Sequence, residues 1–151
     1  MTFVVPFDGT ALSRAALLRA DRFSTVLEKD VVAVTVVPKG NAEYAHEKGW
    51  LEDDESFSLR TVLSRVHQDV VDTVPQANFR HVVVDRYASP GTVATRLRRV
   101  AREVDASMVF IGSENAGRIV NNISSVGATV AAERTYDVVI VRSEIEPDRP
   151  D

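Results

Sequence analysis

Apolar runs of strand length alternate along the chain with stretches in which apolar residues recur every three or four positions. The runs predict β-strands at residues 3–7, 31–37, 79–87, 107–112 and 137–143. The periodic stretches predict amphipathic helices at residues 12–27, 59–74, 93–104 and 123–134. Regular alternation of the two is typical of one doubly wound α/β domain. The predicted fold is a five-stranded, mostly parallel sheet with helices on both faces.

The second run, "VVAVTVV" at 31–37, is almost entirely apolar and β-branched. A strand of this kind is buried on both faces, as in a parallel sheet. The domain is expected to span residues 1–143, because no linker or internal repeat interrupts the pattern before that point. The acidic, proline-containing end at 144–151 is predicted to be a flexible tail.

Between Pro38 and Glu55 the periodicity disappears and a long polar excursion follows. Excursions of this length are usually functional or mobile. Two aromatic residues in it, Tyr44 and Trp50, have two interpretations: they anchor a protein partner, or they cover part of the protein's own surface.

Composition narrows the class of protein. The formal charge is −4 and the isoelectric point is about 5.4, which disfavours nucleic acid and anionic membranes as partners. The chain has no cysteine, so disulfides, thiolate metal sites and cysteine nucleophiles are excluded. Neither a signal peptide nor a run of eighteen apolar residues is present, so the cytoplasm is the expected compartment.

Ligands of an open α/β sheet bind at the carboxyl ends of the strands, where the strand order reverses. Four segments are predicted to lie at such ends: "PFDGT", "VVPKG", "YASPG" and "IGSENAGR". The first and fourth strands are natural neighbours in this fold, so Asp8 and Gly112 are expected to face one crevice. Asp8 either accepts hydrogen bonds from a ribose or a base edge, or it has a structural role, in which it caps the first helix or closes the tight turn with Gly9. Thr10 is the other candidate for the helix cap.

The segment "IGSENAGRIVNNISSVG" (111–127) is the clearest candidate for a phosphate site. Glycines after a strand let backbone N–H groups approach a phosphate, and the N-terminus of the following helix adds partial positive charge. Ser124 and Ser125 are placed to donate hydroxyls, and Arg118 to supply a cation. The alternative is an ordinary loop with a serine cap, because neither G-x-G-x-x-G nor G-x-x-x-x-G-K-[ST] occurs.

No catalytic set or metal cluster emerges from the sequence. Glu43, His46 and Glu47 have helical ligand spacing but lie in a polar stretch typical of a solvated face. No serine occurs in G-x-S-x-G, so a hydrolase triad has no anchor. No catalytic residue and no protein-held metal is therefore predicted.

Taken together, the blocks resemble the universal stress protein family from about residue 3 to residue 142. "VVPFDGTALSRAAL" is similar to the family's first strand and helix entry, with Pro6, Asp8 and Thr10 at its Pro, Asp and Ser/Thr positions. "ASPGTVATRLRRVAREVDASMVFIGS" and "SSVGATVAAERTYDVVIVRS" resemble its later helix–strand units, in the same order and spacing.

This resemblance implies the adenine nucleotide α-hydrolase-like fold and a homodimer paired through the last strand, here 138–141. Some members bind ATP through the first-strand Pro and Asp, backbone near Val37, and the motif G-x2-G-x9-G-[ST]; others lack the motif. Gly112 matches its first glycine, but Asn115 stands at the second. Strict counting places the final pair on Ser125 and Val126, whereas alignment from the last strand places it on Ser124 and Ser125 and matches Gly117 to a later glycine.

The candidate ligand is therefore ATP or AMP, with Mg²⁺ expected only alongside ATP. The candidate cofactor-binding residues are Pro6, Asp8, Thr10, Val37, Ile111, Gly112, Asn115, Gly117, Ser124, Ser125 and Val126. Three functions stay open. The first is a cytoplasmic stress-response regulator that binds an adenine nucleotide, the second is a dimeric interaction module with an empty crevice, and the third is a slow ATP hydrolase.

Overall fold

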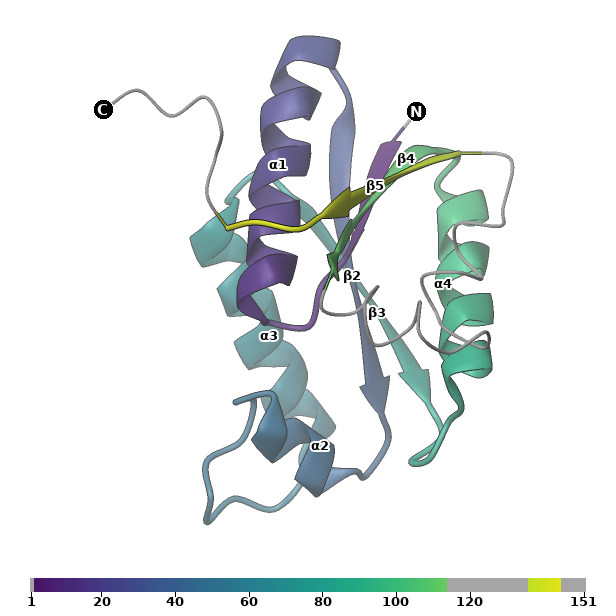
Figure 1. The fold of residues 1–151 in the computed structure, drawn as a ribbon. Coiled ribbons are helices and arrows are strands. Elements are labelled where there is room, and N and C mark those ends of the chain that lie inside the picture. The colour runs from purple at the N-terminus through teal and green to yellow at the C-terminus, as the bar shows by residue number, and fades with distance from the viewer. Residues whose placement is uncertain (1, 114–135, 145–151) are drawn as a thin grey trace.

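The computed structural model describes residues 2–113 and 136–144 (Figure 1). Its strands are β1 (Thr2–Pro6), β2 (Asp30–Pro38), β3 (Asn78–Val84), β4 (Ala106–Gly112) and β5 (Asp137–Val141). Its helices are α1 (Ala11–Leu27), α2 (Ala42–Glu47), α3 (Leu59–Thr73) and α4 (Pro90–Glu103). The fifth strand is shorter than predicted. The expected helix at 123–134 and nearly all of the expected tail lie outside the described residues.

The five strands form one sheet in the order β3-β2-β1-β4-β5, and every neighbouring pair is parallel. The predicted α/β fold class is therefore confirmed. From β1 the chain builds outward through β2 to β3, then crosses to the other side of β1 to add β4 and β5. The strand order consequently reverses between β1 and β4, which makes their carboxyl ends the expected ligand position.

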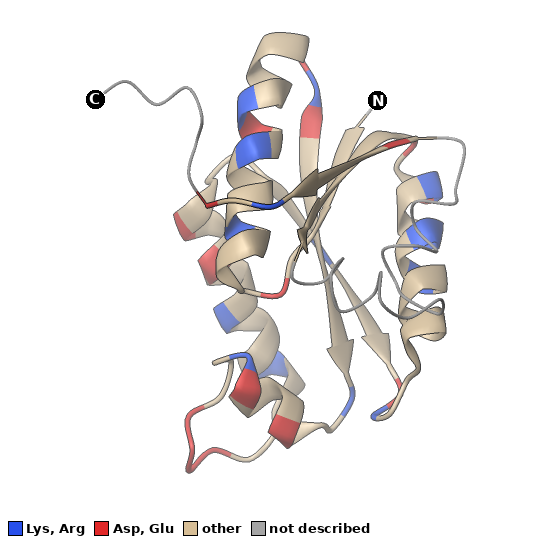
Figure 2. Cartoon of the chain, in the orientation of Figure 1, with Lys and Arg blue, Asp and Glu red and all other residues tan. Residues whose placement is uncertain are grey.

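The sheet separates α1 and α3 from α4 (Figure 1), and one hydrophobic cluster lies on each of its faces. Phe3 and Val5 of β1 face α1 and α3, whereas Val4 faces α4. This alternation along β1 follows from the two-residue period of a strand, and it buries β1 on both sides. Figure 2 shows that charged residues lie mainly on the helices and loops, with Lys and Arg residues along α4.

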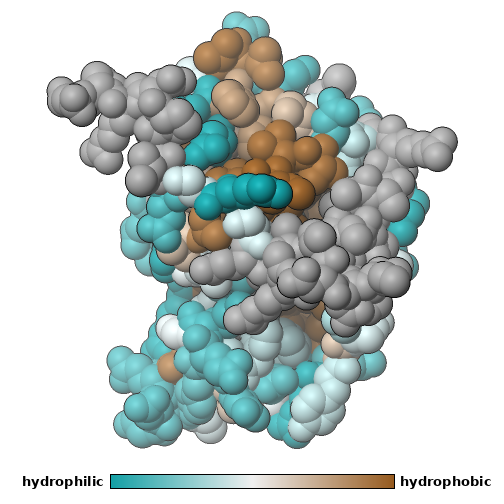
Figure 3. Space-filling view, viewed as in Figure 1, coloured by the Kyte–Doolittle hydropathy of each residue, from teal (hydrophilic) through white to brown (hydrophobic). Residues whose placement is uncertain are grey.

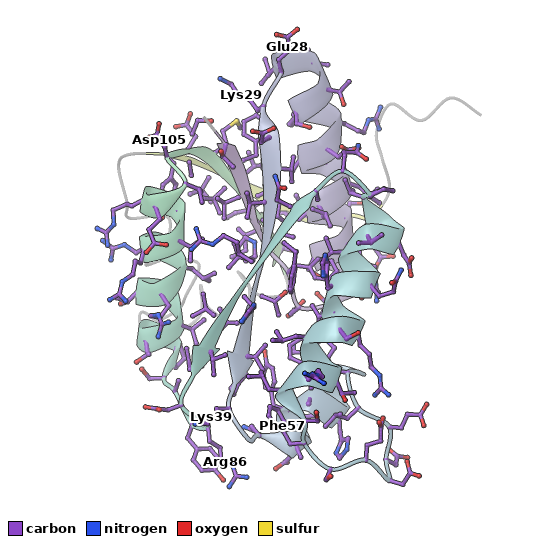
Figure 4. The ribbon with its side chains drawn as sticks, turned by 180° about the vertical axis from the view of Figure 1, so that it is seen from behind. Glu28, Lys29, Lys39, Phe57, Arg86 and Asp105 are labelled. Atoms are coloured by element: carbon purple, nitrogen blue, oxygen red, sulfur yellow. The ribbon has the colours of Figure 1, made fainter. Side chains whose placement is uncertain are left out.

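Each described helix begins at a polar cap. The caps are Thr10 for α1, Asn41 for α2, Ser58 for α3 and Ser89 for α4, and each side chain accepts a hydrogen bond from a backbone N–H three residues later. The prediction that Thr10 caps the first helix is confirmed. At the amino ends of the strands, Glu28 leads from α1 into β2 and Asp105 leads from α4 into β4 (Figure 4). Both residues adopt left-handed backbone conformations.

The third strand ends three residues earlier than the sequence predicts, at residue 84 instead of residue 87. β3 ends at Val84, and the N–H of Ala88 donates to the carbonyl of Asp85 at 3.1 Å. Lys39 and Arg86 lie together beyond the carboxyl ends of β2 and β3 (Figure 4). The Arg86 guanidinium donates to the carbonyl of Gly40, which ties the two connections to each other.

The polar excursion is folded rather than structureless. Asn41 caps the short helix α2, and the chain after it carries Trp50 and Leu51 into the hydrophobic core beside α3. Trp50 is only 4% exposed, and its ring lies 5.6 Å from that of Tyr44. The hypothesis that Trp50 anchors a protein partner is therefore wrong, because its side chain is consumed by the protein's own packing.

Candidate functional site

The carboxyl end of β1 leads directly into the first turn of α1. Pro6 is buried, the N–H of Phe7 donates to the carbonyl of Val34, and Gly9 turns the chain with φ of +81°. A positive φ is readily available to glycine and strained for other residues, so the tight turn requires Gly9. Asp8 is thereby held at the reversal point of the sheet, immediately before the α1 cap.

Both oxygens of the Asp8 carboxylate are engaged. Oδ1 accepts from the backbone N–H of Thr10 at 3.1 Å and from its hydroxyl at 2.7 Å. Oδ2 accepts from the ammonium of Lys48 at 2.9 Å. Asp8 therefore braces the capping turn, in agreement with its structural interpretation, and pairs with a charged side chain, whereas its role toward a ligand stays a prediction.

Lys48 is a site residue that the sequence interpretation missed. It follows α2 as its C-cap, and its ammonium lies 5.4 Å from the centre of the Tyr44 ring. The side chains of Lys48 and Asp8 are 13% and 14% exposed. No periodicity or motif connects Lys48 to Asp8 across a sequence separation of forty residues, so only the packing of the excursion shows that the two meet.

The environment of Asp8 favours its ionised form. Burial opposes ionisation, but the hydrogen bonds from Lys48 and Thr10 outweigh it and lower the pKa of Asp8 from 3.8 to about 2. A group whose pKa is depressed in the folded state stabilises the fold above its unfolded pKa. That contribution is lost as the pH falls through the folded pKa.

Asp8→Asn is expected to lower the free energy of unfolding by about 2 kcal/mol at neutral pH, since the pKa shift of Asp8 is nearly two units. The deficit relative to wild type should shrink as the pH falls from about 4 to about 2, where the wild-type carboxylate also loses its charge. Urea unfolding across this pH range measures the difference. Asp54→Asn, on an exposed loop, is the matched control. A deficit that does not change with pH would contradict this account.

Val37 and Ile111 contribute backbone rather than side chain to this edge of the sheet. Both side chains are 1% exposed. The register between β1 and β2 ends with Pro6 opposite Val34, so Val37 lies beyond the end of β1 while still paired to Val83 of β3. The use of backbone near Val37 by a ligand stays a prediction.

Gly112 closes the site from β4. A Cβ atom added at Gly112 would lie 2.9 Å from the backbone carbon of Leu12 and 3.0 Å from its carbonyl oxygen. The end of β4 therefore touches the first turn of α1, which is the same turn that Asp8 and Thr10 organise. The strands that carry Asp8 and Gly112 are neighbours, as expected, whereas the crevice that the two residues are predicted to share stays a prediction.

The remaining candidates lie outside the described residues. Asn115, Gly117, Ser124, Ser125 and Val126 are in this group, so their roles stay predictions. Within residues 2–113 and 136–144, no group of three or more His, Asp or Glu side chains is placed to hold a metal ion. No helix in those ranges is both long and apolar enough to cross a membrane.

An all-parallel sheet whose strand order reverses between β1 and β4 defines an open, doubly wound α/β domain, a class of protein in which ligands bind at the carboxyl ends of the strands. The family model described as the universal stress protein family matches residues 1–142. This chain belongs to the universal stress protein family. Among curated proteins, no sequence matches it.

Solved structures agree on the fold. A universal stress protein in complex with cAMP is 24% identical, with a TM-score of 0.61 over 93% of this chain and 95% of the other. The Archaeoglobus fulgidus universal stress protein in complex with dAMP is 20% identical, with a TM-score of 0.54 over 94% and 98% of the two chains. UspA from Lactobacillus plantarum is 14% identical, with a TM-score of 0.57 over 94% and 97%.

Proposed function

We propose that this protein is a stress-response regulator that binds an adenine nucleotide where β1 and β4 end. The observation that carries the proposal is the shared first turn of α1. Asp8 bonds to Thr10 on one side of this turn, and Gly112 touches Leu12 on the other. The carboxylate of Asp8, which can accept a hydrogen bond from a hydroxyl or an amine, and the glycine that ends β4 thus both lie at the first turn of α1. The N-terminus of this helix favours anions.

The family and its ligands support the choice of an adenine nucleotide. Two structural relatives are complexes with cAMP and with dAMP. The motif beginning at Gly112 lacks two of its glycines, so we favour a monophosphate such as AMP over ATP. Mg²⁺ would accompany ATP only.

A regulatory role is favoured over hydrolysis. A general base works best when its pKa lies near the working pH. The pKa of Asp8 is about 2, so this carboxylate is a poor base for activating water near neutral pH. Hydrolysis above that of an Asp8→Ala control would be needed to support the enzymatic alternative.

The purified protein is expected to release an adenine nucleotide when it is denatured, which mass spectrometry identifies. Added AMP should raise the melting temperature of nucleotide-free protein, because a ligand at one hundred times its Kd stabilises the native state by about 2.7 kcal/mol. GMP is the control for the base, and ATP with and without Mg²⁺ tests the longer phosphate chain. If neither AMP nor ATP moves the melting temperature at millimolar concentration, the proposed function is wrong.

We also propose a homodimer paired through β5, residues 138–141. β5 lies at one edge of the sheet and is apolar along this stretch, with Ile140 41% exposed. Figure 3 shows hydrophobic surface over α1 and along β5, and Leu18 and Phe23 of α1 are likewise exposed. Exposed apolar surface beside an open strand edge is typical of an association site.

Ile140→Asp is expected to shift the protein from dimer to monomer, because a charge on this strand would be desolvated at the pairing edge. Sedimentation equilibrium measures the mass. Tyr87→Asp, at a site that is 83% exposed and beyond β3, should leave the dimer intact. A wild-type protein that sediments as a monomer at every concentration tested would contradict the proposed pairing.

A further inference from the structure

The contact between Lys48 and Asp8 is built into the fold. The backbone at Lys48 is fixed by its N–H, which donates to the carbonyl of Tyr44 at 3.0 Å. On either side of it, Ala45 and Trp50 are 1% and 4% exposed and belong to the hydrophobic core. The ammonium then extends 2.9 Å from Asp8, with the Tyr44 ring beside it. The connection between β2 and α3 thus delivers a positive charge to the end of β1.

We propose that Lys48 is a specificity-determining residue that makes the site select phosphorylated nucleosides over the corresponding neutral nucleosides. This inference rests on the proposed function. It identifies a class of ligand through a residue of this chain that lies outside the strand ends and outside the glycine motif.

Oδ2 of Asp8 is the carboxylate oxygen that does not bond to Thr10. The Lys48 ammonium already donates to Oδ2, so a ligand hydroxyl or amine that approaches this oxygen competes with the ammonium for it. A neutral nucleoside would exchange a charge-assisted contact for a weaker hydrogen bond and leave a largely buried ammonium without its carboxylate. Such an exchange is unfavourable, because removing one member of a buried pair leaves the other uncompensated.

A nucleotide changes this balance. Its phosphate offers the displaced ammonium a new anionic partner, and the lysine stem is flexible enough to follow it. The same cation also offsets the negative charge of Asp8, which would otherwise repel the phosphate. Lys48 therefore lowers the affinity for adenosine and raises the affinity for AMP, because its ammonium can exchange Asp8 only for a phosphate.

The test compares the affinities of AMP and adenosine by calorimetry for wild type and three variants. In wild type, AMP should bind more tightly than adenosine. In Lys48→Met, adenosine should bind more tightly and AMP more weakly, so that the ratio of their affinities falls by about tenfold or more. Lys48→Arg retains the cation and should retain most of the preference.

Lys39→Met is the matched control. Lys39 is also a lysine at the carboxyl edge of the sheet, but it is exposed at the end of β2. Its replacement should leave the ratio unchanged. An equal fall in Lys39→Met and Lys48→Met would assign the preference to general charge and overturn the inference.

A double variant guards against a folding defect. In Asp8→Asn/Lys48→Met both partners are removed, so no charge is left unpaired, and this protein should fold even where the single variant does not. It should also lose preference for AMP, but by less than Lys48→Met, because the carboxylate that repels the phosphate has been removed as well. An unchanged ratio in it, or in Lys48→Met, would overturn the inference while leaving nucleotide binding standing. If no adenine ligand binds wild type at all, the proposed function fails, and the inference fails with it.

Discussion

Trp50→Ala is expected to lower the free energy of unfolding by about 3–5 kcal/mol, the largest single loss that we predict. Trp50 is 4% exposed, and it joins the core cluster formed by α1, α3 and one face of the sheet. Removal of the indole would leave a cavity beside the turn at Gly9. The indole Nε1 lies close to this turn, 3.5 Å from where a Cβ atom added to Gly9 would be. Chemical denaturation followed by circular dichroism measures the loss.

Trp50→Phe is the informative control. Within the described residues, Nε1 of Trp50 has no hydrogen-bond partner, so replacing the indole N–H removes no bond from the folded state. The phenylalanine variant should therefore lose only part of the packing and much less stability than the alanine variant. Equal losses would show that the N–H, rather than the volume of the ring, stabilises this region. A negligible loss in both variants would mean that the excursion does not pack as described.

Gly112→Val is expected to destabilise the fold by at least about 1–3 kcal/mol, the range typical of overpacking. The added Cβ would lie 2.9 Å from a backbone carbon of Leu12, and the branched side chain adds two further atoms in the same space. Backbone cannot move aside as a flexible side chain can, so α1 and β4 would have to separate. Thermal and urea unfolding measure the change.

Gly91→Ala is the matched control for Gly112→Val. A Cβ at Gly91 would lie 3.7 Å from the hydroxyl of Ser89, an ordinary contact, and Gly91 lies near the start of α4. Alanine is a better helix former than glycine, so this change should be neutral or mildly stabilising. If the two glycine substitutions cost the same, close packing at Gly112 is not the cause. Loss of nucleotide binding in a Gly112 variant must be judged against its stability, because this glycine has a packing role whether or not a phosphate lies beside it.

Most of the fold could be predicted because its determinants are local. The apolar run at 31–37 and the repeats in α1, α3 and α4 reflect burial on a strand or a helix, and each can be recognised without knowledge of its neighbours. The adjacency of β1 and β4, which end near Asp8 and at Gly112, could also be predicted, since the first and fourth strands are neighbours in a fold of this type. Helix ends were equally accessible where a cap such as Ser89 precedes a proline.

The rest depends on long-range packing that leaves no periodic trace. The helix α2 is one and a half turns long, too short to show an apolar face, so it appeared only as part of a polar stretch. Lys48 carries no sign of its partner, because a lysine in a polar segment is usually solvated. Its position follows from the burial of Trp50 and Leu51 nearby, and aromatic residues in a polar segment were the available signal.

The two outer strands of the sheet, β3 and β5, differ in polarity, and this difference is expected to limit polymerisation of the protein. At β3, Arg80 carries a charge held by Glu103 at 2.8 Å, and His81 is exposed beside it. Charged and polar side chains on a border strand discourage a foreign strand from adding to it. β5 is apolar by comparison. A fibre grows by strand addition only if each molecule can pair through both outer strands of its sheet. Because only β5 is suited to pairing, strand addition in this protein is expected to stop at a dimer.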